Sequence, residues 1–142
     1  MKASKRLEYW ISKRVYANLY PYVDGSFPEV SFEDFLKETK ENGYMKISNE
    51  YCDNTIFSAP IYNVLFRAWH DDCHIRLNKG FTYPDENEVA FYQAAELPKN
   101  WYKEKLLVLS DIIGQGTYFV KHNDFPTNQK EFTAQLFENG KI

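Results

Sequence analysis

The chain contains few of the residues and segments that mark specialised classes of protein. Its 142 residues include only two cysteines, Cys52 and Cys73. That number excludes a disulfide framework and is typical of a reducing, intracellular compartment. No apolar run approaches the roughly 20 residues that span a bilayer, and no signal-peptide hydrophobic segment is present. These absences predict a cytoplasmic protein without a membrane segment.

The chain also lacks a large excess of charge of one sign. Its formal net charge is -3, so the sequence provides no general attraction for phosphate backbones, and nonspecific nucleic-acid binding is disfavoured. A local group of basic residues near the start is expected on the solvated side of a first helix. The group consists of Lys2, Lys5, Arg6, Lys13 and Arg14.

Large hydrophobic side chains are abundant, by contrast. Hydrophobic residues make up 44% of the chain and aromatic residues 18%, which excludes a disordered protein and provides for a well-packed core. The length suffices for one domain and is too short for two ordinary ones. We expect residues 1–142 to form a single helical domain, with some of the tyrosines lining a cleft or a protein interface.

Hydrophobic periodicity and capping signals predict six helices. The sharpest boundaries are Ser31 with Asp34 at capping-box spacing, Gly43 as a stop, and Pro60 in a first turn. The expected helices lie at about residues 4–20, 31–43, 60–78, 85–97, 101–121 and 127–137. The helix at 101–121 is apolar nearly all round, which is typical of a central helix. Residues 44–58 have no sustained period, so they are either irregular or a short strand pair, and they are expected to be mostly loop. The predicted fold is an all-α, compact single-domain bundle of five or six helices.

Two of the three histidines, His70 and His74, lie one helical turn apart within an apolar segment. Residues i and i+4 share a helix face, so both imidazoles are able to hold one metal ion, zinc or iron. The alternative is a pair of surface or core histidines that hydrogen-bond to neighbours, because this spacing without a motif glutamate is weaker evidence than H-E-x-x-H.

Glu88 is the nearest plausible third ligand. Glu86 is a substitute ligand, although its position is one residue away from the preferred direction. Glu88 has a competing role, because with Asp85 it has the spacing of a second capping box. Asp71 and Asp72 are candidates for orienting an imidazole N–H, although acidic residues on helices are more often simply solvated.

A polar stripe on the long helix provides further candidates. Asp111, Gln115, Tyr118 and His122 lie at i, i+4, i+7 and i+11. A buried carboxylate needs a cation, a donor or a metal, so Asp111 is predicted to be a fourth ligand or a general base, with Gln115 beside it as a second catalytic candidate. The alternative is that the stripe is simply the solvent-exposed side of this helix.

Three short motifs in residues 60–135 resemble those of small uncharacterised bacteriophage proteins. They are Leu65-Phe66-Arg67-Ala68-Trp69-His70-Asp71, then Glu88-Val89-Ala90, and Asp111-Ile112-Ile113-Gly114-Gln115. The resemblance implies a phage-encoded protein whose His/carboxylate site is built from His70, His74, Glu88 and Asp111, with Gln115 adjacent. It implies no established activity.

Two hypotheses for the function follow. In the first, a divalent metal, zinc or iron, lowers the pKa of a bound water for the hydrolysis of a small molecule. In the second, a non-enzymatic phage protein, either a virion component or an inhibitor of a host factor, acts through protein contacts while the polar cluster only stabilises the fold. Known metal-dependent HD phosphohydrolases fit poorly, because no histidine precedes His70.

Overall fold

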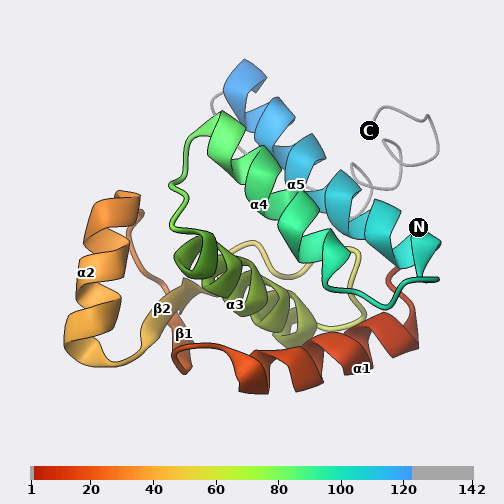
Figure 1. Cartoon of the computed structure of the whole chain (residues 1–142), viewed down its shortest axis with the longest axis horizontal. Coiled ribbons are helices and arrows are strands. Elements are labelled where there is room, and N and C mark those ends of the chain that lie inside the picture. Colours follow the sequence, from red (N-terminus) through yellow and green to blue (C-terminus); the bar gives the residue numbers. More distant parts are fainter. Residues whose placement is uncertain (1, 123–142) are drawn as a thin grey trace.

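The computed structural model describes the backbone of residues 2–122 and the side chains up to Gly114. In this part the elements are α1 (Lys5–Arg14), the 3₁₀ helix η1 (Val15–Ala17), β1 (Tyr22–Gly25), α2 (Phe32–Asn42), β2 (Met45–Ser48), α3 (Pro60–Leu77), α4 (Tyr83–Ala95) and α5 (Tyr102–His122) (Figure 1). The fold is mostly helical, but β1 and β2 form a small parallel sheet, which corrects the all-α expectation. The helix predicted at 127–137 lies outside the described residues. Within the described part, no helix is both long enough and apolar enough to cross a membrane.

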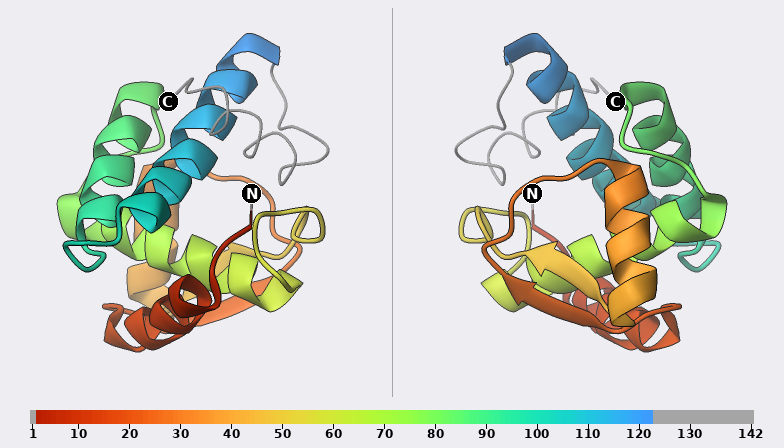
Figure 2. Two further views of the ribbon diagram at one scale, coloured as in Figure 1. Left: turned by 90° about the vertical axis from the view of Figure 1, so that its right-hand side faces the viewer. Right: turned by 90° about the vertical axis from the view of Figure 1, so that its left-hand side faces the viewer.

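Helix α3 occupies the centre of the core. Its Phe66, Trp69 and Cys73 belong to a hydrophobic cluster with α1, α4 and α5. Its Val64 and Ala68 belong to a second cluster with α2 and β2. Helices α4 and α5 lie side by side on one side of α3, and α1 lies on another (Figures 1 and 2). The sequence predicted α5 as the central helix, yet α3 is the element shared by both clusters.

Local signals define the limits of α2 and α3 as predicted. The Asp34 N–H donates to Ser31 Oγ at 3.1 Å, and Gly43 closes α2 in the left-handed conformation with φ 78°. Pro60 begins α3, and Asn78, also left-handed at φ 51°, ends it. These caps involve neighbouring residues only, so sequence patterns are sufficient to predict them.

The first helix is shorter than predicted, because its last residues bond to α3 instead. After Arg14 the chain passes through η1, and Asn18 is already extended. The Asn18 side-chain amide donates to the Ala68 carbonyl at 3.1 Å, and the Leu19 N–H donates to Asp72 Oδ1 at 2.8 Å. These long-range bonds replace the helical bonds that the periodic pattern implied.

The two strands are four-residue segments. Sequence patterns did not predict β1, whereas β2 lies in the 44–58 segment, for which a short strand pair was the alternative to an irregular chain. Strand β1 pairs with β2 from Tyr22↔Met45 to Gly25↔Ser48, and α2 connects them. The rest of the 44–58 segment, from Asn49 onward, contains neither helix nor strand, in agreement with the expected loop. Parallel pairing depends on a distant partner, so such short strands have little local signature.

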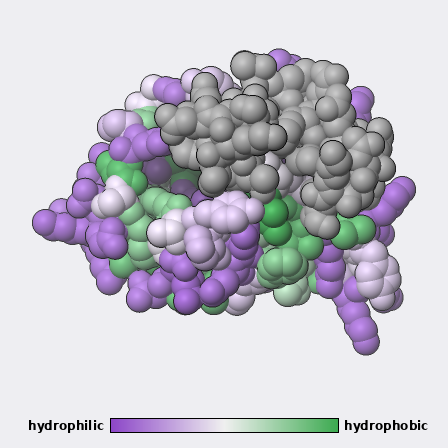
Figure 3. All heavy atoms as spheres, turned by 90° about the horizontal axis from the view of Figure 1, so that it is seen from above, coloured by the Kyte–Doolittle hydropathy of each residue, from purple (hydrophilic) through white to green (hydrophobic). Residues whose placement is uncertain are grey.

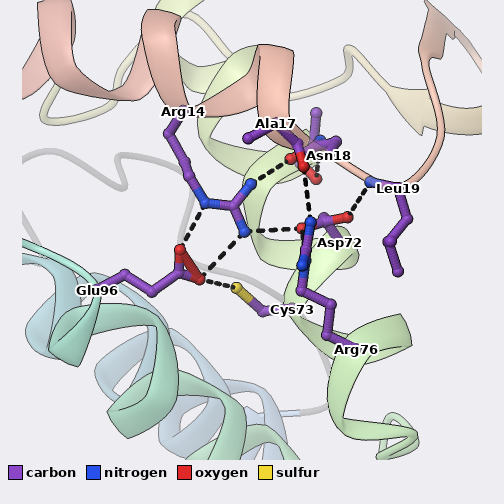
Figure 4. A network of polar contacts seen from close by, with 9 residues as sticks. Arg14, Ala17, Asn18, Leu19, Asp72, Cys73, Arg76 and Glu96 are labelled. Atoms are coloured by element: carbon purple, nitrogen blue, oxygen red, sulfur yellow. Dashed lines mark hydrogen bonds and ion pairs between the residues drawn. The ribbon is translucent and has the colours of Figure 1, made fainter.

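A buried ion-pair network joins α1, α3 and α4 (Figure 4). Asp72 is fully buried, and its Oδ2 accepts hydrogen bonds from Arg14 at 2.8 Å and Arg76 at 2.7 Å. Arg14 also donates from Nε to Glu96 Oε2 at 2.5 Å. A carboxylate buried this deeply is stabilised only by such paired cations. Asp72 therefore fixes α1 against α3 and takes no part in orienting the histidines.

Both cysteines are buried, which predicts that neither thiol reacts in the folded protein. Burial and the neighbouring Glu96 carboxylate raise the pKa of the Cys73 thiol, and burial raises that of Cys52. Since thiolates are the reactive form, iodoacetamide is expected to modify neither cysteine in native protein and both in guanidinium. Intact mass spectrometry measures this, and rapid native labelling of Cys73 would contradict the packing of α3 against α4.

Candidate metal centre

His70 and His74 on α3 point toward a carboxylate on α4. The two Nε2 atoms lie 3.1 Å apart. Glu86 Oε1 lies 3.0 Å from His70 Nε2 and 2.5 Å from His74 Nε2. Ligand bonds of about 2.1 Å at tetrahedral angles separate the ligand atoms of zinc by about 3.4 Å. The two longer edges of this triangle are close to that spacing, whereas the shortest is a hydrogen-bond length, so an ion would fit between the three atoms once Glu86 Oε1 moved away from His74 Nε2.

Both imidazole rings are oriented by carbonyl oxygens on their other side. His70 Nδ1 lies 2.6 Å from Gln93 Oε1, and His74 Nδ1 lies 2.9 Å from the Lys79 carbonyl oxygen. A carbonyl oxygen only accepts, so each Nδ1 carries the hydrogen and each Nε2 presents a lone pair when its ring is neutral. Metal-binding histidines are usually held in this way.

The convergence of three acceptor atoms requires positive charge between them. Two protons, one on each Nε2, supply the same charge as one divalent ion. Burial by itself lowers the pKa of His70, but the charge and hydrogen bond of Glu86 outweigh it and raise this pKa to about 9. Burial opposes ionisation of Glu86, yet the two imidazoles hold its pKa well below the usual range. The carboxylate is thus ionised, and protons compete with a metal for the same position.

Asp71 and Asp111 lie near this centre. A carboxylate oxygen of the half-buried Asp71 lies within 4.8 Å of one ring nitrogen of His70 and one of His74. Burial raises the pKa of Asp71, and the charges of both histidines oppose that rise. Asp111 on α5 is 4% exposed, and it lines the same cavity as His70, Asp71 and Glu86.

The cavity has a volume of about 650 Å³, which lies within the range of pockets for small molecules. It is bounded by α3, α4 and α5 on the side of the histidines and by β2 and the segment before α2 on the other. The site therefore combines a ligand triangle with space for a small molecule beside it.

The structure brings His70 and His74 together but places the predicted ligand Glu88 elsewhere. The Glu88 side chain is 59% exposed and lies 3.4 Å from Lys79 Nζ. Helix α4 begins at Tyr83 rather than at Asp85, and Asp85 instead accepts the Gly80 N–H at 3.0 Å. Positions two residues apart in a helix differ by about 200° around its axis. Glu88 therefore lies on the opposite side of α4 from Glu86.

Sequence reasoning gave Glu86 only second rank and missed Gln93 entirely. The two residues lie at i and i+7 on the face of α4 that also contains the buried Val89 and Ala90. Polar residues inside an apolar stripe are a signal that was available. The expectation that Asp71 or Asp72 orients an imidazole is corrected, because Gln93 and the Lys79 carbonyl have that role.

The roles predicted for Asp111, as ligand or general base, and for Gln115 remain predictions. The Gln115 side chain lies outside the described part of the structure. Comparison of the chain with known protein families, with curated proteins and with solved structures finds no match. The resemblance of residues 60–135 to bacteriophage proteins is likewise still a prediction.

Proposed function

We propose that this protein binds one divalent metal ion, zinc or iron, through His70, His74 and Glu86, and hydrolyses a small molecule in the adjoining cavity. The observation that carries the proposal is the convergence of the two Nε2 atoms and Glu86 Oε1 within 3.1 Å. Two imidazoles and one carboxylate suit either metal. A phage-encoded enzyme in the host cytoplasm is the setting that the sequence resemblance implies.

The residues around the triangle have separate tasks in this proposal. A bound metal with three protein ligands keeps a position open, and it lowers the pKa of a water there. Gln93 and the Lys79 carbonyl hold the rings in their ligand orientation. Asp111, the predicted general base, and Asp71, which has a carboxylate oxygen within 4.8 Å of a ring nitrogen of each histidine, are the carboxylates of the cavity that would accept a proton from such a water.

The second candidate is a non-enzymatic protein in which protons take the place of the metal. The raised pKa of His70, at about 9, favours this candidate, because an imidazolium paired with Glu86 would join α3 to α4 without any metal. Two exposed aromatic residues, Tyr9 on α1 at 65% exposure and Tyr16 in η1 at 88%, would then suit a protein partner. A virion component or an inhibitor of a host factor fits this candidate.

Metal content distinguishes the two candidates. We expect untagged wild-type protein to contain about one metal per chain by inductively coupled plasma mass spectrometry, either as purified or after reconstitution with zinc or ferrous iron. The His70→Ala/His74→Ala double variant, with its fold checked by circular dichroism, is expected to contain none. Absence of metal from reconstituted wild type would overturn the proposal.

Turnover then separates an enzyme from a protein with a structural metal. The metal-loaded wild type is screened against chromogenic esters and phosphoesters, with the double variant as control. Hydrolysis by wild type alone supports the proposed enzyme. A stoichiometric metal without turnover, together with a lower melting temperature after chelation, indicates that the metal only stabilises the fold.

A further inference from the structure

A half-buried arginine lines the cavity beside the proposed metal centre. Arg67 lies on α3 one helical turn before His70 and Asp71, so all three share one face of this helix. Its Nη1 donates to the Ser48 carbonyl at 2.8 Å, which fixes the side chain against β2. None of the ion pairs within residues 2–114 includes Arg67.

The guanidinium group therefore retains hydrogen-bonding capacity toward the cavity. It has five N–H donors arranged in a planar fork, and one bond to a single carbonyl oxygen leaves most of them available. Carboxylate and phosphate groups match this fork with two parallel hydrogen bonds. A fixed arginine at a cavity wall is suited to hold such a group in one orientation.

Most of the cavity wall is apolar, which suits the rest of such a molecule. The apolar lining includes Phe27, Val30, Phe35, Ile47, Phe81 and Ile112. Two of these residues, Val30 and Phe81, are 37% and 38% exposed. Figure 3 shows that hydrophobic residues also lie beside hydrophilic ones on one face of the molecule. Apolar walls with a few placed polar groups are typical of pockets for small organic ligands.

The charges at the inner end of the cavity permit an anion at Arg67. With one divalent ion bound, its charge and that of Arg67 would balance the carboxylates of Asp71, Glu86 and Asp111, which line the cavity with Arg67. Lys46 contributes another positive charge at the rim, where Glu29 and Glu50 are exposed and well screened by water. An acidic ligand therefore enters a region without a large excess of negative charge once the metal is bound.

We propose that Arg67 binds the oxyanion head group, carboxylate or phosphate, of a small substrate whose apolar body fills the cavity. This inference rests on the proposed function, because it names the substrate class of the same site. It places the bond to be hydrolysed between the Arg67 subsite and the ligand triangle of His70, His74 and Glu86.

Three probes with the same aromatic body test the inference. 2-Naphthoate and 2-naphthyl phosphate are anionic, and 2-naphthamide is neutral; calorimetry measures the binding of each to zinc-free and zinc-loaded protein. We expect at least one anion to bind about tenfold or more tightly than the amide in the zinc-loaded form, where the charges of the cavity would be balanced, and a smaller preference in the same direction in the zinc-free form. Arg67→Gln is expected to abolish this preference, whereas Lys40→Gln, which removes an exposed charge on α2, preserves it.

Three outcomes would overturn the inference. They are equal binding of the anions and the amide, a preference that survives in Arg67→Gln, and a preference that exists only with zinc, since the metal would then hold the anion. If Arg67→Gln does not fold, Arg67→Lys keeps the charge but loses the fork, and it is expected to reduce the preference. The measurement on zinc-free protein requires no metal. If the metal proposal fails, the preference for an anion in zinc-free protein can still be tested, so the two failures give different results.

Discussion

Replacement of Asp72 with alanine is expected to lower the free energy of unfolding by about 3–5 kcal/mol. The substitution removes a fully buried carboxylate that accepts hydrogen bonds from Arg14, Arg76 and the Leu19 N–H. It leaves Arg76 without its paired carboxylate, Arg14 with Glu96 alone, and the Leu19 N–H without its acceptor. Urea denaturation followed by circular dichroism measures the change.

The adjacent residue on the same helix provides a matched control. Asp71 is half-buried and faces the cavity, and it belongs to none of the ion pairs of the described residues. Asp71→Ala is therefore expected to change the free energy of unfolding by no more than about 0.5 kcal/mol. Similar losses in the two variants would mean that the ion-pair network does not hold α1 against α3.

Replacement of Glu86 with glutamine is expected to weaken zinc binding by at least about 100-fold. Loss of a residue that only orients a metal ligand costs about 10–100-fold, and Glu86 supplies a ligand oxygen and its negative charge directly. Glutamine preserves the length of the side chain, so the packing of α4 on α3 is retained. Competition with a chromogenic chelator measures the affinity.

Glu88→Gln is the control for this prediction, because it removes the same charge from the same helix. Its side chain lies beside Lys79 and is 59% exposed, so zinc affinity is expected to stay within about twofold of wild type, since exposed charges are well screened. A large loss in Glu88→Gln with little change in Glu86→Gln would instead support the ligand set predicted from the sequence. Equal losses would indicate a general effect of charge rather than coordination.

The two histidines were predictable because their relation is local. Once residues 60–77 form a helix, the spacing of His70 and His74 directs both side chains to one face. The identity of the carboxylate was not predictable in the same way, because it depends on the rotation of α4 about its axis. Glu86 and Gln93 lie on the face of α4 that contains the buried Val89 and Ala90, and Glu88 lies on the opposite face.

The same distinction between local and long-range contacts applies to the fold. Caps at Ser31, Gly43 and Pro60 define helix limits from adjacent residues. The early end of α1 and the pairing of β1 with β2 depend on contacts between distant segments, such as the Leu19 N–H bond to Asp72. The predicted all-α class was therefore nearly right in helix content and wrong about the small sheet.

Local sequence alone was thus sufficient for most of the helices and for the shared face of His70 and His74. The packing of α4 against α3 was needed to select Glu86 over Glu88 and to bring Gln93 behind His70. The reason is geometric: side chains within one turn have positions set by the helix itself, whereas partners on two helices depend on the rotation of each helix about its axis. Rotation of α4 by about half a turn would exchange Glu86 for Glu88.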